Sequence, residues 1–166
     1  FMKDSHRTAL AVNFNLRNPV HFFALGFGSG LLKPAPGTWG TLAGVPIYLW
    51  LSTFPLTTYL LVTAFAFFIG IWLCDVTCRD AGVHDHGAIV WDEIVGLLIT
   101  MTAVPYSLST LLLGFLLFRL FDILKPWPIR VLDRRVGGGF GVMIDDLLAG
   151  VFAGAVLLLV FSWGWI

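Results

Sequence analysis

Long apolar runs dominate this chain, and its charged residues are confined to three segments, residues 3–33, 75–93 and 119–146. Hydrophobic residues make up 58% of the sequence and charged residues 12%, whereas soluble domains have roughly 45–50% and 25%. About 20 consecutive apolar residues suffice to cross the roughly 30 Å hydrocarbon core of a bilayer. The sequence therefore predicts an integral membrane protein.

Five candidate spans follow from the apolar runs: residues 41–54, 56–74, 88–104, 107–124 and 143–163. The links at 52–57 and 103–109 carry no charge and predict helical hairpins, while the links at 75–87 and 125–141 are polar. Residues 19–32 form a short, glycine-containing apolar run, which is typical of a re-entrant or interfacial segment. We expect an all-α membrane bundle of four or five spans, with one domain over residues 19–166 after an amino-terminal tail over 1–18.

The distribution of charge also predicts an orientation. Threading the spans alternately across the bilayer brings all three charged segments to one side. Basic residues in short loops stay in the cytoplasm, so we expect that side to be cytoplasmic, with the tail there too. The first twenty residues lack the pattern of a cleavable signal peptide, and we expect Cys74 and Cys78 to be reduced. Formal net charge is zero, which gives no indication of a nucleic-acid partner.

Acidic residues recur where polar segments meet the spans. Asp92 and Glu93 are expected one turn inside a helix, Asp122 near the end of the next, and Asp145 with Asp146 at the start of the last. Carboxylates brought together repel one another unless a cation lies between them, and an all-oxygen ligand set favours magnesium or manganese. The alternative is that Asp122 pairs with Arg119 or Lys125, and that Asp145 and Asp146 only favour a helix amino terminus.

Basic residues lie beside these acids in the sequence and could hold a phosphate. They are Arg119, Lys125, Arg130, Arg134 and Arg135, with Lys33 arriving from the glycine-rich segment. The alternative is that such residues attract anionic lipid and set the topology without touching a substrate.

Two further motifs carry weaker signals. GFGSGLLKPAPGTWG, residues 26–40, has glycines that could let backbone amides approach an anion, followed by a rigid turn at 36–38 that includes Thr38. It matches neither a Walker sequence nor the dinucleotide-binding fingerprint. Close helix packing through small residues explains the glycines at least as well. His84 and His86 flank Asp85; for them a general-acid or structural hydrogen-bonding role is favoured over zinc binding.

Read together, GFGSGLLKPAPGTWG, HDHGAIVWDE and FRLFDILKPWPIRVLDRRVGGGFGVMIDD resemble bacterial phosphatidylglycerophosphatase A over residues 19–154. This resemblance implies magnesium-dependent hydrolysis of phosphatidylglycerophosphate to phosphatidylglycerol and inorganic phosphate at the bacterial inner membrane. The motif positions carried over are Asp92, Glu93, Asp122, Asp145 and Asp146.

The resulting hypothesis gives each group a role. Asp92, Glu93, Asp145 and Asp146 are the expected catalytic residues, and together with Asp122 the expected ligands of Mg²⁺. Lys33, Thr38, His84, His86, Arg119, Lys125, Arg130 and Arg134 are the expected substrate-binding residues. Attack by metal-activated water is favoured, and an aspartyl-phosphate intermediate is the alternative. Another lipid-phosphate phosphotransferase, an ion-coupled transporter and a non-catalytic scaffold remain as other functions, and the oligomeric state is open.

Overall fold

The computed structural model describes residues 13–166, so most of the predicted tail lies outside the described residues. Within this range the chain forms helices and no strand, which confirms the all-α prediction. The elements are α1 (Pro19–Ala24), the 3₁₀ turn η1 (Ser29–Leu31), α2 (Pro36–Leu51), α3 (Leu56–Ala81), α4 (Trp91–Met101), α5 (Leu108–Leu124), α6 (Ile129–Arg135) and α7 (Gly138–Ser162).

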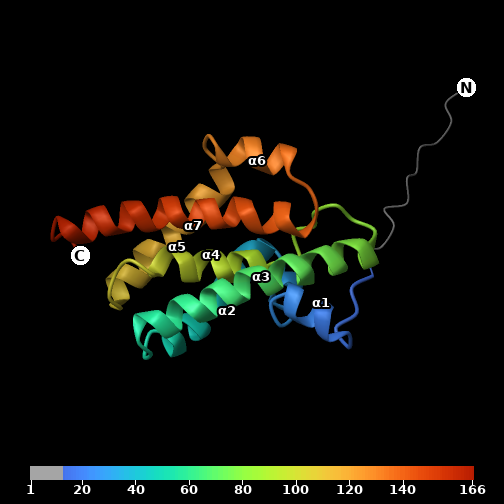
Figure 1. The fold of residues 1–166 in the computed structure, drawn as a ribbon, viewed down its shortest axis with the longest axis horizontal. Helices are drawn as coiled ribbons and strands as arrows, with labels where there is room; N and C mark the ends of the chain where they lie inside the picture. The colour runs from blue at the N-terminus through green and yellow to red at the C-terminus, as the bar shows by residue number, and fades with distance from the viewer. Residues whose placement is uncertain (1–12) are drawn as a thin grey trace, which may run out of the picture.

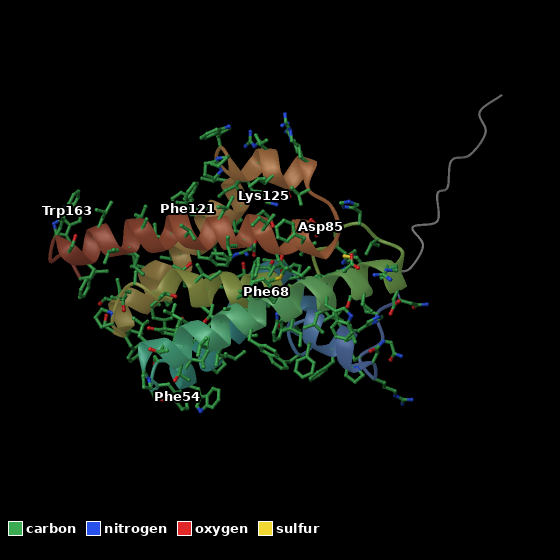
Figure 2. All side chains as sticks on the ribbon, in the orientation of Figure 1. Phe54, Phe68, Asp85, Phe121, Lys125 and Trp163 are labelled. Atoms are coloured by element: carbon green, nitrogen blue, oxygen red, sulfur yellow. The ribbon has the colours of Figure 1, made fainter. Side chains whose placement is uncertain are left out.

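The helices α2, α3, α4, α5 and α7 run along the long axis of the molecule, and α4 packs against the other four (Figure 1). Successive members of this set alternate in direction, because short links at 52–55 and 102–107 form the two predicted hairpins. Phe54 and Trp163 lie toward one end of the molecule and Asp85 toward the other (Figure 2). The charge-free tips are thus separated from the charged link between α3 and α4.

Two helices, α3 and α7, are long and apolar enough to cross a membrane by length and composition. The predicted number of four or five spans is not confirmed. At 1.5 Å per residue the 11 residues of α4 extend only about 16 Å, about half of the hydrocarbon thickness. Large apolar side chains nevertheless cover the outside of the molecule: Phe65 and Phe68 of α3 are 67% and 68% exposed, and Leu116 of α5 is 65% exposed.

Several helix boundaries differ from the predicted ones because they follow local capping residues and backbone hydrogen bonds rather than hydropathy. Helix α2 begins at Pro36, so the expected rigid turn at 36–38 is its first turn, where proline is favoured. Helix α3 continues through the polar residues after Cys74 and ends before Gly82, whose φ of 66° is typical of a helix C-terminus. Helix α4 begins only at Trp91, because residues 87–88 form a turn, Ile89 N–H donates to the carbonyl of His86, and Val90 N–H donates to the carbonyl of Ala24.

The polar link at 125–141 contains two helical segments that the sequence reading missed. Helix α6 occupies its middle, and α7 begins at Gly138 rather than near Met143. A Cβ at Gly139 would lie 1.9 Å from the carbonyl oxygen of Ile71 in α3. The glycines here therefore permit close helix packing, and Asp145 and Asp146 lie two turns inside α7 rather than at its start.

The segment predicted to be re-entrant folds as α1 and η1, joined by turns. It packs beside α3, where the buried His21 ring contacts Asp80 with Nε2 and Oδ2 3.1 Å apart. The two cysteines, Cys74 and Cys78, are free and buried in α3.

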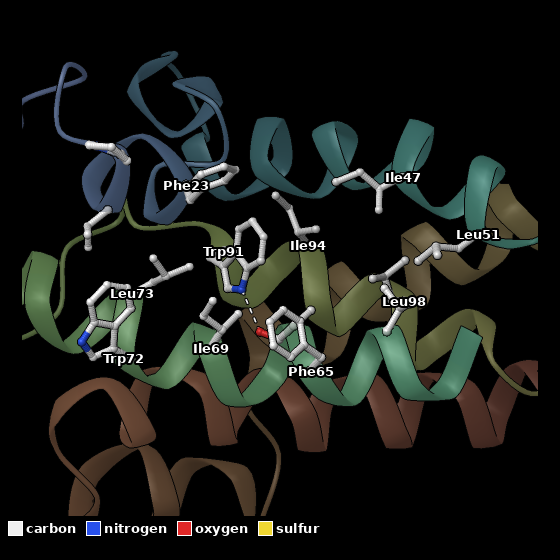
Figure 3. A pocket seen from close by; sticks show the side chains of 14 residues that line it. Phe23, Ile47, Leu51, Phe65, Ile69, Trp72, Leu73, Trp91, Ile94 and Leu98 are labelled. Atoms are coloured by element: carbon white, nitrogen blue, oxygen red, sulfur yellow. Dashed lines mark hydrogen bonds between the residues drawn. The ribbon is translucent and has the colours of Figure 1, made fainter. Parts of the chain in front are cut away.

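An apolar groove of about 470 Å³ runs between α1, α2, α3 and α4. Phe23, Ile47, Phe65 and Leu98 are among the side chains that line it, and Trp91, near the middle of the groove, donates its indole N–H to the carbonyl of Ala66 (Figure 3). The lining side chains are apolar or aromatic. Such a surface suits contact with hydrocarbon rather than with water.

Candidate active site

A cavity of about 190 Å³ lies between α4, α5, α7 and the link that precedes α4. It brings together acidic residues from all three helices named in the sequence reading. Its lining consists of Asp85, Gly87, Ile89, Asp92, Glu93, Asp122, Lys125, Val142, Asp145 and Asp146.

Close packing of α4 on α7 places the carboxylates opposite one another. A Cβ at Gly96 would lie 3.3 Å from the carbonyl oxygen of Asp146, and one at Gly150 would lie 2.7 Å from the carbonyl oxygen of Gly96. Side chains at either position would therefore push the helices apart. Asp92 and Glu93 lie in the first turn of α4, each 9% exposed, and Asp146 of α7 is 3% exposed.

Three of these carboxylates form the tightest group. One oxygen each from Asp92, Glu93 and Asp146 lies within 4.8 Å of the other two. The buried atoms Asp92 Oδ1, Glu93 Oε2 and Asp146 Oδ2 have no hydrogen-bond partner among the described residues. Buried polar atoms are nearly always paired, so this group has the chemistry of a site for a cation. Hard divalent ions such as Mg²⁺ prefer carboxylate oxygens.

The other two predicted metal ligands have basic partners. Asp122 forms an ion pair with Arg119 one helical turn earlier in α5, as the alternative reading anticipated, yet it still lines the cavity. Asp145 accepts a hydrogen bond from Lys125 at 2.6 Å, while its other oxygen is buried without a partner. Only the first three carboxylates are therefore grouped at metal-ligand spacing.

Arg119 lies between the acidic group and the first turn of α2. Its Nη1 is 3.8 Å from Glu93 Oε1, and its buried Nε has no hydrogen-bond partner among the described residues. Gly37, in the first turn of α2, covers this pair: a Cβ there would lie 2.5 Å from Glu93 Oε1 and 2.9 Å from Arg119 Nη2. The absence of a side chain at residue 37 thus leaves room for the ion pair.

Lys125 lies at the end of α5 and bridges α6 and α7. Its Nζ donates to Asp133 Oδ1 at 2.7 Å and to Asp145 Oδ2 at 2.6 Å. Burial by itself lowers the pKa of the Lys125 ammonium, but the hydrogen bonds to Asp133 and Asp145 outweigh burial and leave the pKa above its usual value. The two hydrogen bonds therefore favour the positively charged form of Lys125 at the cavity wall.

The remaining predicted substrate-binding residues do not line the cavity. Lys33, His84, Arg130, Arg134 and Arg135 are exposed, and Thr38 is half-buried in the first turn of α2. His86 stacks edge-on against Phe14, with ring centroids 5.2 Å apart, and its Nδ1 accepts the N–H of Ala88. These contacts suit the structural role considered for His86. The substrate-binding roles of Lys33, Thr38, His84, Arg130 and Arg134, and the phosphate contact considered for Arg135, stay predictions.

Two residues in or beside the cavity were not assigned a role from the sequence. Asp85 lines the cavity from the link before α4, and Asp133 contacts it through Lys125. The sequence feature that could have pointed to Asp85 is its position between His84 and His86. The sequence gives no separate signal for Asp133, because residues 125–141 are predicted only as a polar link and α6 lies within it.

The apolar groove is separate from this cavity. Trp91, Ile94 and Leu98 face the groove from one side of α4, whereas Asp92 and Glu93 face the cavity from the other. Successive helical residues point about 100° apart, which explains how neighbouring residues reach opposite surfaces.

Comparisons with known proteins identify the family of the chain. The profile of the family described as phosphatidylglycerophosphatase A matches residues 22–161. A phosphatidylglycerophosphatase A from Haemophilus influenzae is 50% identical over 151 residues, covering 90% of this chain and 93% of the relative. One from Escherichia coli is 45% identical over 153 residues, covering 92% and 89%.

A third relative, from Bacteroides thetaiotaomicron, is provisionally named a phosphatidylinositol-3-phosphatase; it is 38% identical over 149 residues, covering 83% of this chain and 90% of its own. No solved structure gives a significant match. The family profile spans most of the chain and two relatives of the same name match it along nearly their whole length. The chain belongs to the phosphatidylglycerophosphatase A family.

Proposed function

We propose that this protein removes the terminal phosphate of phosphatidylglycerophosphate, releasing phosphatidylglycerol and inorganic phosphate. The observation that carries the proposal is the meeting of buried, unpaired carboxylate oxygens from α4 and α7 in one cavity with a lysine at its wall. Membership of the phosphatidylglycerophosphatase A family supplies the substrate.

Asp92, Glu93 and Asp146 are the residues we propose to hold Mg²⁺. Their oxygens are close enough to share one ion, and each has a buried atom that lacks another partner. Bound there, Mg²⁺ would supply positive charge to the phosphate oxygens and lower the pKa of water. Asp122 and Asp145, both engaged by basic residues, are proposed to orient this group from either side.

Basic residues of the chain hold the phosphate in this proposal. Lys125 and Arg119 lie on the α5 side of the acidic group, so that each can donate to a phosphate oxygen. A water oxygen attacks phosphorus, the phosphorus–oxygen bond to the glycerol breaks, and the glycerol oxygen takes up a proton to become a free hydroxyl. Direct attack by water and transfer through an aspartate differ in whether phosphorus is ever bonded to the protein.

A multi-pass arrangement in the bacterial inner membrane, with the cavity facing the cytoplasm, is part of the proposal. The exposed apolar side chains of α3 and α5 support burial in lipid. The charge-free hairpin tip at Phe54 and the charged link at Asp85 lie at opposite ends of the molecule (Figure 2), which supports an orientation set by the basic residues. A phosphomonoester on a lipid headgroup would then meet the cavity near the leaflet surface.

The test is phosphate release by the purified protein in detergent micelles. Phosphatidylglycerophosphate should yield free phosphate with Mg²⁺ and none after chelation. Phosphatidylinositol 3-phosphate serves as the competing lipid phosphomonoester, since one relative carries that name. Transfer of the phosphate to another lipid without free phosphate would indicate a phosphotransferase, and no turnover of either lipid would refute the proposal. Retention of phosphorus-32 on the denatured chain would favour an aspartyl-phosphate.

A further inference from the structure

The ammonium of Lys125 is held between two carboxylates of different environments. Asp145, 8% exposed at its side chain, lies inside the cavity, whereas Asp133, 33% exposed, approaches from α6 outside it. The two contacts, 2.6 and 2.7 Å, are nearly equal in length. Neither carboxylate alone therefore sets the position of the ammonium.

One of the three N–H groups of the Lys125 ammonium has no acceptor among the described residues. An ammonium has three N–H donors, and in residues 13–166 its only acceptors are Asp133 and Asp145. Because the side chain lines the cavity, the third N–H is available to a ligand there. The hydrogen bond to Asp133 keeps the ammonium from pairing with Asp145 alone.

Packing of helix α6 against the bundle fixes the position of the Asp133 backbone. Ile129, one turn earlier on the same face of α6, is fully buried in a cluster with Phe118, Ala149 and Ala153. Residues four apart on a helix share a face, so the anchoring of Ile129 also directs Asp133 toward Lys125. Arg130 and Arg134, on the other side of α6, are exposed.

We propose that Asp133 is a positioning residue: it holds the Lys125 ammonium so that the third N–H faces the phosphate of the bound substrate. The inference rests on the proposed function for the identity of that substrate. It assigns to α6 a role in binding the phosphate, carried out through Lys125 and without contact between Asp133 and the lipid.

The rival explanation is that Asp133 only fastens α6 to the bundle. The two explanations differ in what Asp133→Asn changes. A positioning residue raises KM while the melting temperature without ligand stays close to that of the parent, whereas a fastening residue lowers that melting temperature. Because Asp133 pairs with Lys125, either role loses its effect once Lys125 is removed, and the double variant tests only whether Asp133 acts through Lys125.

The experiment compares the full-length parent, Asp133→Asn, Lys125→Gln and the double variant, with Asp80→Asn as control. Asp80 is another partly exposed aspartate in an ion pair, but it pairs with His21 away from the cavity. We expect Asp133→Asn to raise KM about tenfold, the ratio expected for losing one hydrogen bond to a charged group, with kcat within about twofold, the pattern of lost ground-state binding. The double variant should match Lys125→Gln, and Asp133→Glu should recover part of the loss.

A second measurement does not depend on turnover. Inorganic phosphate in the presence of Mg²⁺ should raise the melting temperature of the parent and of Asp80→Asn, and raise it less in Asp133→Asn and Lys125→Gln. Unchanged KM and an unchanged phosphate effect in Asp133→Asn would overturn the inference, as would additive losses in the double variant. A parent that binds phosphate but hydrolyses neither lipid would refute the proposed function and leave the positioning role standing.

Discussion

Replacing Asp146 by asparagine should separate the stability of the empty acidic group from its ability to bind metal. One oxygen of Asp146 lies within 4.8 Å of oxygens of both Asp92 and Glu93. At that distance, and at an effective dielectric constant of about 20, two like charges repel by about 3.5 kcal/mol. Asparagine removes one charge and hence two of the three repulsive pairs.

The repulsion relieved is therefore about 7 kcal/mol at full ionisation. The measurable gain is smaller, because carboxylates that face one another take up protons to reduce the repulsion. A net gain of about 1 kcal/mol would raise the melting temperature by about 2–4 °C for a chain of this size. In chelator, Asp146→Asn should consequently melt at a higher temperature than the parent.

Magnesium should reverse that order. Mg²⁺ stabilises only a folded state that binds it, so titration should raise the melting temperature of the parent and have little effect on Asp146→Asn. Phosphate release by the variant should fall at least a hundredfold. Thermal unfolding in detergent, with and without chelator, measures the first effect, and Asp80→Asn, whose ion pair with His21 lies outside the cavity, is the control. A variant that is destabilised in chelator and retains both the Mg²⁺ response and activity would refute the reasoning about this carboxylate group.

Three further changes test other parts of the structure. Gly37→Ala should lower phosphate release at least tenfold with little loss of stability, because the new Cβ would lie 2.5 Å from a cavity carboxylate oxygen; full activity would show that the first turn of α2 can move away. Gly96→Ala should lower the free energy of unfolding by about 1–3 kcal/mol, since its Cβ would lie 2.4 Å from the ring of Phe118, and thermal or denaturant unfolding measures the loss. Arg130→Gln with Arg134→Gln should change kcat/KM less than threefold, as both side chains are exposed and outside the cavity; a tenfold loss in the phosphate-release assay would support their predicted role as substrate ligands.

The sequence by itself determined the helical class, the two hairpins and the gathering of acids near one end. The long apolar segments predict membrane helices, and the alternation of charge-free and charged links between them leaves few ways to arrange these helices across a bilayer. Asp92, Asp122 and Asp145 line one cavity because each stands where a polar segment meets a helix of the same alternating set. The order of residues along the chain suffices for this prediction, because the prediction concerns only which helix ends lie on the same side of the bundle.

The tertiary structure decided which of those acids are paired and which are free. Asp122 has Arg119 and Asp145 has Lys125 as a close partner, whereas Asp92 and Asp146 have no basic partner among the described residues and Glu93 has only a longer contact of 3.8 Å with Arg119. That division depends on contacts of a few ångströms between helices distant in sequence, which local spacing does not encode. The sequence does not predict the short helix α6 either, because its seven residues are too few to form a stable helix alone. Burial of Ile129 against α5 and α7 stabilises it in the folded protein.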